Sequence, residues 1–443
     1  MTAQGSTLQA ISIERMGYGP EAVGHLASGK AVFVPGAAPG DVVSVEVVED
    51  RPTFARARLA EVLEPGEARV AAPACAGACG GCPWAHLSYE AQLAAKRASV
   101  ADALVRVGRF ERAEAEALVA PCAPSARQWG YRNKVELACA VGADGNPEVG
   151  LSEHGTGRLV PLERCPLAPK AIERAPRALR GALRFALGGQ DLGLFRIGVR
   201  HSLRTRETEI ALWTRPGAFP RKAVAGVLGD ALKATSIVRV MAEEGKARKV
   251  KKVEVLAGRG CWGEELAGNR LLASAPSFFQ VNTAQAERLV GLVMEGLALE
   301  PGAFVADLYS GVGTFTLPLA QAGCDVAAVE SAGSSVRDLR RNAEAAGVDV
   351  EVIGGDAARE LPELGRLDAL VVDPPRAGLH ESIVGAIAAA GPEAVAYVSC
   401  DPQTWARDMA RLAAAGYRLQ AATPVDLFPQ TYHVEVASIL RRA

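Results

Sequence analysis

Residues 368–401 contain the side chains whose types and spacing are best suited to chemistry. Two short apolar runs, 369–372 and 394–398, have the length and composition of buried parallel strands. The first run leads into Asp373, and the second leads into Cys400. Ligands of open α/β sheets bind at the carboxyl ends of the strands, so the pattern predicts that Cys400 lies in a binding cleft. A cysteine at this position is placed as a nucleophile would be.

A second set of residues predicts a nucleoside site. In the βαβ series predicted for residues 303–356, Asp307, Glu330 and Asp356 stand at the ends of three successive strands. A Gly-x-Gly turn at residues 311–313 lacks the third glycine of the dinucleotide fingerprint. Glu330 is placed to accept the hydroxyls of a ribose. The arrangement predicts an S-adenosylmethionine site, because carboxylates suit a sulfonium charge; three acidic caps in an unrelated doubly wound fold are the alternative.

A methyl donor gives Cys400 a reaction. Uracil C5 is a poor nucleophile, but a thiolate that adds at C6 creates an enolate whose C5 can attack a methyl sulfonium. A base must then remove the C5 proton. The last predicted strand, residues 431–440, offers Glu435, whose pKa burial would raise, and His433, which we interpret as a packing residue.

Three cysteines near the N-terminus form a separate candidate site. Cys75, Cys79 and Cys82 lie within one short glycine-containing segment, and Cys165 stands in a remote Cys-Pro pair that can close a ligand set. The spacing alone fits an iron–sulfur cluster or zinc equally well, and free cysteines are the remaining alternative.

Several predicted elements position these residues. Residues 11–63 contain strand-like runs separated by glycine and proline turns, which favours a small β-barrel with Lys30, Arg51, Arg56 and Arg58 available to phosphates. A mixed α+β pattern follows from residue 129 to residue 255 and ends in a basic run that includes Lys246, Arg248, Lys249, Lys251 and Lys252, which we interpret as an RNA contact rather than a solvated turn. The predicted helices cover residues 89–107, 170–187, 283–299 and 316–322.

Composition limits the class of protein. The 443 residues are 49% hydrophobic with a formal net charge of -1, which is ample for several cores and excludes a polybasic protein. No apolar run approaches the roughly 20 residues that span a bilayer, and no signal peptide is evident, so we expect a cytoplasmic protein without membrane contact. No obligate protein partner is inferred.

Five blocks in order resemble the RNA uracil-5 methyltransferases. They are residues 278–282 (FFQVN), 307–317 (DLYSGVGTFTL), 373–378 (DPPRAG), 399–402 (SCDP) and 426–435 (DLFPQTYHVE). Residues 13–62 resemble a TRAM domain, an OB-like RNA-binding barrel, and the cysteine set resembles the [4Fe-4S] site of the same family. The resemblance covers nearly the whole chain and agrees with the chemistry inferred from Cys400.

The resemblance implies a role for each matching residue. Cys400 would be the nucleophile and Glu435 the base. The methyl donor, S-adenosyl-L-methionine, would lie among Gln280, Tyr309, Glu330 and Asp373, to which the strand-end pattern adds Asp356. The ligands of the [4Fe-4S] cluster would be Cys75, Cys79, Cys82 and Cys165. Ser310 stands where many relatives have cysteine, and the Cys75 to Cys79 spacing is short for the family.

The expected architecture is a Rossmann-like class I methyltransferase domain at residues 276–443, preceded by a TRAM-like barrel at 1–63 and a mixed α+β central domain with the cluster segment at 64–275. The barrel and cluster together resemble the ribosomal RNA enzymes, so 23S ribosomal RNA is the expected substrate, with an unstacked uridine flipped into the pocket. The alternatives are a transfer RNA uracil-5 methyltransferase, an NAD-dependent oxidoreductase and a non-catalytic RNA-binding protein. The last two leave Cys400 and Glu435 unused.

Overall fold

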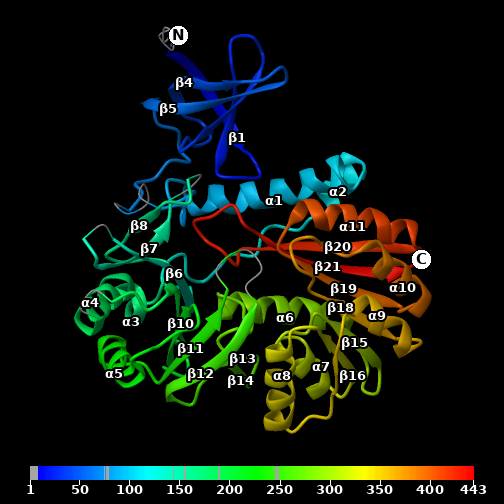
Figure 1. Cartoon of the computed structure of the whole chain (residues 1–443). Helices are drawn as coiled ribbons and strands as arrows, with labels where there is room; N and C mark the ends of the chain where they lie inside the picture. The colour runs from blue at the N-terminus through cyan, green and yellow to red at the C-terminus, as the bar shows by residue number, and fades with distance from the viewer. Residues whose placement is uncertain are drawn as a thin grey trace.

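The structure is a computed structural model, and it describes residues 8–73, 75, 79–142, 144–153, 156–187, 190–243, 245 and 249–443. An N-terminal barrel, a central sheet with helices and a C-terminal sheet with helices on both faces make up the chain (Figure 1). Helix α1 (Tyr89–Arg106) runs beneath the barrel and packs against α11 (Pro402–Ala414). The predicted fold class is therefore confirmed.

The first five strands close into a barrel in the order β1-β2-β3-β5-β4. Alternate residues such as Ile11 and Ile13 are buried, because successive side chains of a strand face opposite sides. Trp84 follows the barrel in the chain and is fully buried against this core, where its indole N–H donates to the Gly19 carbonyl (3.1 Å). The strands are β1 (Gln9–Met16), β2 (Glu21–His25), β3 (Ala31–Pro35), β4 (Val42–Asp50) and β5 (Phe54–Glu64).

The central region is a seven-stranded sheet of order β12-β11-β10-β9-β6-β7-β8, antiparallel except between β10 and β11. Apolar side chains of helices α4 and α5, such as Leu179 and Leu228, pack onto this sheet. Its elements are β6 (Lys134–Val141), β7 (Pro147–Ser152), β8 (Leu159–Pro161), α3 (Lys170–Glu173), α4 (Ala175–Leu187), β9 (Leu194–His201), β10 (Thr208–Thr214), α5 (Arg221–Leu232), β11 (Ser236–Ala242) and β12 (Val250–Gly258). Beside it lie helix α2 (Arg112–Leu118) and the hairpin of β13 (Trp262–Leu266) and β14 (Asn269–Ala273).

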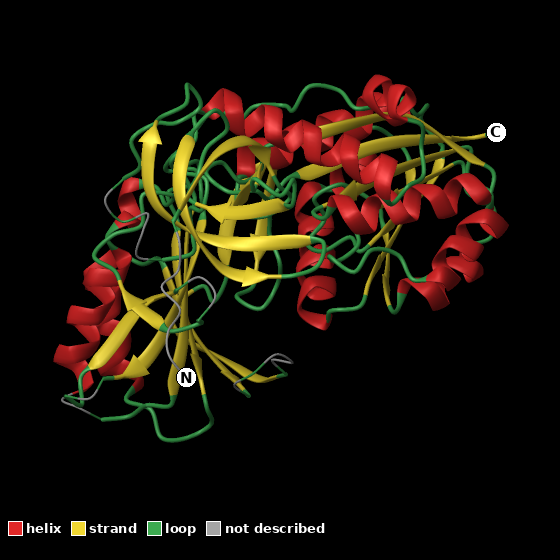
Figure 2. Ribbon diagram, turned by 90° about the horizontal axis from the view of Figure 1, so that it is seen from above, coloured by secondary structure: helices red, strands yellow, loops and turns green. Residues whose placement is uncertain are grey.

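The C-terminal sheet has the order β17-β16-β15-β18-β19-β21-β20, in which the first five strands are parallel and β21 is antiparallel to both neighbours. The views in Figures 1 and 2 show helices on both of its faces. The elements are α6 (Thr283–Leu297), β15 (Phe304–Leu308), α7 (Thr316–Gln321), β16 (Asp325–Glu330), α8 (Gly333–Ala346), β17 (Glu351–Gly354), α9 (Ala357–Glu360), a 3-10 turn (Leu361–Leu364), β18 (Ala369–Val372), α10 (Glu381–Ala390), β19 (Ala394–Ser399), α11, β20 (Tyr417–Val425) and β21 (Glu435–Arg442).

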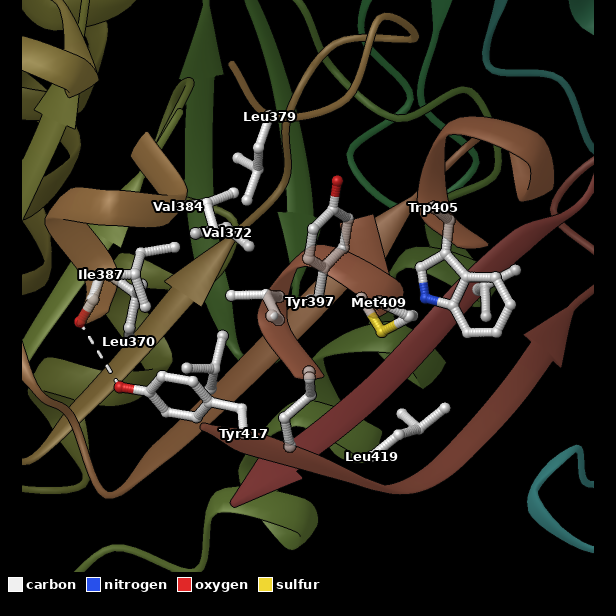
Figure 3. Close-up of a cluster of buried hydrophobic side chains, with 14 of the residues drawn as sticks. Leu370, Val372, Leu379, Val384, Ile387, Tyr397, Trp405, Met409, Tyr417 and Leu419 are labelled. Atoms are coloured by element: carbon white, nitrogen blue, oxygen red, sulfur yellow. Dashed lines mark hydrogen bonds between the residues drawn. The ribbon is translucent and has the colours of Figure 1, made fainter. Parts of the chain in front are cut away.

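Alternation along the central strands of this sheet creates a core on each face. On one face, Leu370, Val372 and Tyr397 point toward helices α10 and α11 and pack with Trp405 and Met409 (Figure 3). The intervening residues of the same strands face α6 and α7. Because the strands are apolar on both sides, they read in the sequence as continuous hydrophobic runs.

Two buried contacts fasten helix α1 to the loop of residues 426–434, which precedes β21. The Lys96 ammonium pairs with the Asp426 carboxylate, and neither side chain is exposed to solvent. Gln92 donates to Oε1 of Gln430 (3.1 Å) and accepts the Gln430 backbone N–H (2.8 Å). Breaking a buried ion pair typically costs about 3–5 kcal/mol, so these contacts hold the loop in one position.

The strands predicted at residues 369–372 and 394–398 are confirmed as β18 and β19, and the helix predicted at 283–299 is confirmed as α6. Asn282 caps α6, since its side chain accepts the N–H of Gln285. No helix in the described ranges is both long and apolar enough to cross a bilayer.

Three expectations were wrong in detail. Residues 170–187 form two helices rather than one, because Pro176 has no N–H to continue the hydrogen-bond ladder. The last strand begins at Glu435 rather than residue 431, since Thr431 closes a turn onto the Phe428 carbonyl (3.2 Å). Lys251 and Lys252 belong to strand β12 and pair with carboxylates, while Lys246 and Arg248 lie outside the described residues.

Candidate active site

Three side chains meet where strands β18, β19 and β21 end or begin. Asp373 follows β18, Cys400 follows β19, and Glu435 is the first residue of β21. In the antiparallel pairing of β19 with β21, Ser399 lies opposite Val436, so the next pair along sets Cys400 beside Glu435. The register of the sheet thus brings the predicted nucleophile and the predicted base together.

The Cys400 thiol lies among a cation and two carboxyl groups. Burial raises the pKa of Cys400 to about 12, and the charges of Glu435 and Asp373 act in the same direction. The Arg376 guanidinium opposes this increase, through its charge and a hydrogen bond to the thiol. Without a ligand, Cys400 is therefore a neutral thiol near pH 7, with one cation available to stabilise its thiolate.

The carboxyl groups of Glu435 and Asp373 are close together. Burial and the charge of Asp373 raise the pKa of Glu435 well above its ordinary value, while Arg376 acts against them. Burial also raises the pKa of Asp373 to about 7, against a hydrogen bond with the Gln280 side chain. Oε2 of Glu435 is buried and has no hydrogen-bond partner among the described residues. A carboxyl group of this kind can take a proton from a ligand near neutral pH.

Gln280 is held from the central region. Its backbone carbonyl accepts the side-chain N–H of Asn133 (2.8 Å). The segment before it is fixed by the buried Arg200, whose guanidinium donates to the carbonyls of Ser274 (2.9 Å) and Ser277 (2.5 Å). The central sheet therefore positions a residue that reaches Asp373 at the edge of the C-terminal sheet.

Glu330 holds the glycine turn that follows β15. Its two carboxylate oxygens accept the backbone N–H groups of Gly311 (2.9 Å) and Ala332 (2.6 Å). Gly311 and Gly313 have φ angles of 58° and 103°, in the left-handed region that favours glycine. Each oxygen keeps a second lone pair, so the carboxylate remains able to accept hydrogen bonds from hydroxyl groups.

Tyr309, Asp307 and Asp356 surround the same turn. Burial raises the pKa of Tyr309 to about 12, and the charge of the nearby Asp356 adds to this increase. Burial raises the pKa of Asp307 to about 7, although its carboxylate accepts a hydrogen bond from Thr316 (2.5 Å). Two buried atoms, Oδ1 of Asp307 and Oγ of Ser310, have no partner among the described residues. Such orphaned polar atoms at a strand end fit a site that receives a polar ligand.

The four predicted cluster cysteines, Cys75, Cys79, Cys82 and Cys165, line one cavity of about 310 Å³. Burial raises the pKa of Cys82 to about 12, and the charges of the other three thiols would raise it further. In the part of the chain that the structure describes, no group of three or more His, Cys, Asp or Glu side chains is arranged to hold a metal ion. The thiols therefore share a cavity without standing in ligand geometry.

The barrel cations that the sequence offered for phosphate binding are paired with acidic residues of the barrel itself. Lys30 pairs with Asp50 and Arg58 pairs with Glu46. Arg51 and Arg56 likewise contact carboxylates of the same strands. An exposed cation with an adjacent carboxylate contributes less to phosphate attraction than an unpaired one.

Sequence reasoning missed the contribution of Arg376 and of an aromatic group beside Cys400. Arg376 lies in the predicted motif, but its effect on the thiol depends on the loop geometry. The ring of Tyr432 lies 4.2 Å from that of His433 and 6.1 Å from that of Tyr18, a barrel residue. Burial and nearby cations lower the pKa of His433 to about 4, which supports its interpretation as a packing residue. A tyrosine between two glycines in a turn was the only signal for Tyr18.

Comparison with known proteins gives a consistent result. Residues 270–443 match the tRNA (uracil-5-)-methyltransferase family, and residues 3–60 match the TRAM domain. An RNA methyltransferase of Gloeobacter violaceus is 35% identical over 99% of this chain and 97% of its own length. One of Thermotoga maritima is 30% identical over 98% and 99%.

A solved structure is similar over the same length. The tRNA (uracil-54, C5)-methyltransferase of Pyrococcus abyssi, in complex with S-adenosyl-L-homocysteine, is 28% identical with a TM-score of 0.76. The similarity covers 97% of this chain and 99% of that one. Because these likenesses extend over the barrel, the central region and the catalytic sheet together, the chain belongs to the RNA uracil-5 methyltransferase family, which uses S-adenosylmethionine as its methyl donor.

Proposed function

We propose that the protein methylates C5 of a uridine through a covalent bond between Cys400 and uracil C6. The observation that carries this proposal is the position of Cys400 beside Glu435, with Arg376 and Asp373 around them. The Cys400 thiolate attacks C6, the C5–C6 double bond becomes an enolate, and C5 is then the nucleophile for a methyl group. S-adenosylmethionine supplies that methyl group on a sulfonium centre.

Glu435 is the proposed base for the second half of the reaction. After methyl transfer, C5 carries both a methyl group and a proton, and the bond to Cys400 breaks only when that proton leaves. The buried carboxylate of Glu435 takes the proton, the C5–C6 double bond reforms, and the thiolate departs. Its raised pKa suits the task, because a carboxylate with a higher pKa is a stronger base.

The donor site is proposed for Gln280, Tyr309, Glu330, Asp356 and Asp373. The geometry supports this assignment, because the glycine turn, the lone pairs left on Glu330 and the orphaned polar atoms of Asp307 and Ser310 lie at adjacent strand ends. The family membership also replaces the oxidoreductase and non-catalytic alternatives.

Large-subunit (23S) ribosomal RNA is the substrate proposed from the barrel and cysteine segment. Transfer RNA is the second candidate, and a specific observation favours it: a tRNA (uracil-54, C5)-methyltransferase matches 97% of this chain, barrel included. The architecture is therefore compatible with either RNA.

One experiment tests both the reaction and the substrate. The protein is incubated with labelled S-adenosylmethionine and, separately, with unmodified 23S ribosomal RNA and unmodified transfer RNA, and the product nucleosides are separated by chromatography. We expect 5-methyluridine from one of the two RNAs. Label in an amino-group or ribose-methylated nucleoside would contradict the proposed chemistry, and 5-methyluridine from transfer RNA alone would contradict the ribosomal substrate.

We further propose that Cys75, Cys79, Cys82 and Cys165 hold a [4Fe-4S] cluster. Four thiols around one cavity provide the soft ligands that such clusters bind, and Arg132 lines the same cavity as a compensating cation. The proposed role is structural, since the ligands would join the segment after the barrel to the central region. Residues 1–63, 64–275 and 276–443 are the domains proposed on this basis.

A further inference from the structure

A cavity of about 370 Å³ lies between the barrel, helix α1 and the start of helix α11. We call it the barrel–helix cavity; its lining includes Tyr18 of the barrel, Ala94 and Ala98 on the exposed face of α1, and Gln403. The Gln403 backbone N–H donates to the Asp401 carboxylate (2.9 Å), and Asp401 directly follows Cys400. The cavity therefore borders the active site.

The two acidic residues of the barrel–helix cavity are occupied by other partners. Glu14 lies 2.6 Å from a ring nitrogen of His25, a neighbour on the barrel. Asp102 accepts a hydrogen bond from Arg112 (2.7 Å), which belongs to helix α2. Neither carboxylate is directed at the cations that line the same cavity.

Those cations are Arg15 and Arg106, and both are exposed. The Arg15 guanidinium donates to the Met16 carbonyl (3.3 Å), and within the described ranges neither arginine has a carboxylate at ion-pair distance. This differs from the outer face of the barrel, where Arg51 and Arg58 are each paired. The cavity therefore presents two guanidinium groups that can bind phosphates.

An aromatic group lies at the end of this cavity near the active site. Tyr18 and Tyr432 meet edge to face, with ring centroids 6.1 Å apart. The turn that carries Tyr18 is fixed by the hydrogen bond from Trp84 to Gly19 (3.1 Å). Both tyrosines are only half-buried, so part of each ring remains available for contact with a base.

We infer that the barrel–helix cavity holds the RNA strand next to the target uridine, with phosphates on Arg15 and Arg106 and a neighbouring base against Tyr18 and Tyr432. The inference rests on the proposed function, because a uridine that reaches Cys400 must leave its stack and expose its neighbours. Aromatic side chains and guanidinium groups are the usual partners of unstacked single strands. The barrel thus contributes to the active site directly.

The phosphate contacts are tested by binding. Affinity for a fluorescein-labelled oligouridine of about twelve nucleotides is measured by anisotropy between about 50 and 200 mM salt. For the double variant Arg15→Ala, Arg106→Ala, we expect the slope of log K against log salt to fall by about 1.4, since each lost phosphate contact on a single strand is worth about 0.7. The matched control is Arg51→Ala, Arg58→Ala, whose slope should change by less than half as much. Equal slopes in the wild type and the cavity variant would overturn the inference.

The stacking contact is tested with the RNA that the wild-type protein methylates, prepared intact or with an abasic nucleotide on either side of the target. Tyr18→Ala should lower kcat/KM about tenfold on intact RNA and cause no further loss on RNA abasic at the contacted position, while Tyr18→Phe should match the wild type. Equal losses for Tyr18→Ala on intact and abasic RNA would reduce Tyr18 to a packing residue and refute the stacking. Absence of methylation by the wild type would instead refute the proposed function.

Discussion

Cysteines occur in two contrasting environments in this protein. At Cys400, one thiol lies beside two carboxyl groups and a single cation, Arg376. In the cavity of about 310 Å³, four thiols face one another, and Cys82 has the other three as its main charged neighbours. Burial raises the pKa to about 12 for both Cys400 and Cys82.

The difference lies in what can stabilise the thiolate. Four clustered thiolates repel one another and require positive charge at their centre, which an iron–sulfur cluster supplies. Cys400 has a local cation and two carboxyl groups that exchange protons, so its thiolate need form only when substrate is bound. Equal burial therefore accompanies a proposed structural role in one place and a proposed chemical role in the other.

Replacement of Cys400 should give the largest effect. Cys400→Ala removes the nucleophile, so methylation should fall by at least about 10⁴-fold and no covalent protein–RNA species should form. Binding of S-adenosylmethionine, measured by calorimetry, should remain close to that of the wild type. Cys324→Ala, at another buried cysteine of the same region, is the control and should retain activity. Appreciable turnover by Cys400→Ala would mean that the reaction does not proceed through this thiol.

Glu435→Gln should stall the reaction after methyl transfer. The amide cannot take the C5 proton, so turnover should fall by about 10²–10⁴-fold while a denaturation-resistant adduct accumulates. Mass spectrometry should find one methyl group on the RNA in that adduct, and Cys400→Ala, Glu435→Gln should form none. If Glu435→Gln turns over normally or gives no adduct, another group takes the proton.

Arg376→Ala should alter the pH dependence. Because the guanidinium lowers the pKa of Cys400, its removal raises that pKa further and reduces the thiolate fraction at every pH below it. Alkylation of Cys400 by iodoacetamide, followed on its peptide by mass spectrometry, should slow about tenfold at pH 8 if the pKa rises by about one unit. Arg376→Lys keeps the positive charge and should recover most of the rate. An unchanged rate for Arg376→Ala would show that the cation does not act on this thiol.

The local elements of this fold could be predicted from the sequence, because short apolar runs bounded by turns are sufficient to identify buried strands. The segment 369–372 matches β18 residue for residue. The contacts between distant segments could not be predicted in this way. Lys96 and Asp426 pair only because helix α1 packs on the loop before β21, and nothing in the local pattern of either residue indicates the other.

The same distinction applies to the candidate site. Cys400 and Glu435 were identifiable because each follows or begins a strand in a recognisable motif. Tyr18 reaches the site from the opposite end of the chain, through a turn fixed by Trp84. A residue whose position depends on how two regions dock carries no periodicity or spacing that would reveal it.

The cluster cysteines should show the smallest effect on chemistry and a clear effect on stability. Protein purified without oxygen should be brown with about four irons per chain, and Cys82→Ser should lose most of that iron. Because the proposed cluster joins two parts of the chain far from Cys400, we expect the melting temperature to fall by about 5–10 °C while kcat at low temperature changes by no more than about threefold. Cys139→Ser, at a cysteine of strand β6 outside the set, is the matched control and should keep its iron. Stoichiometric zinc without iron would refute the cluster, and a loss of activity as large as that of Cys400→Ala would refute the division between structural and chemical cysteines.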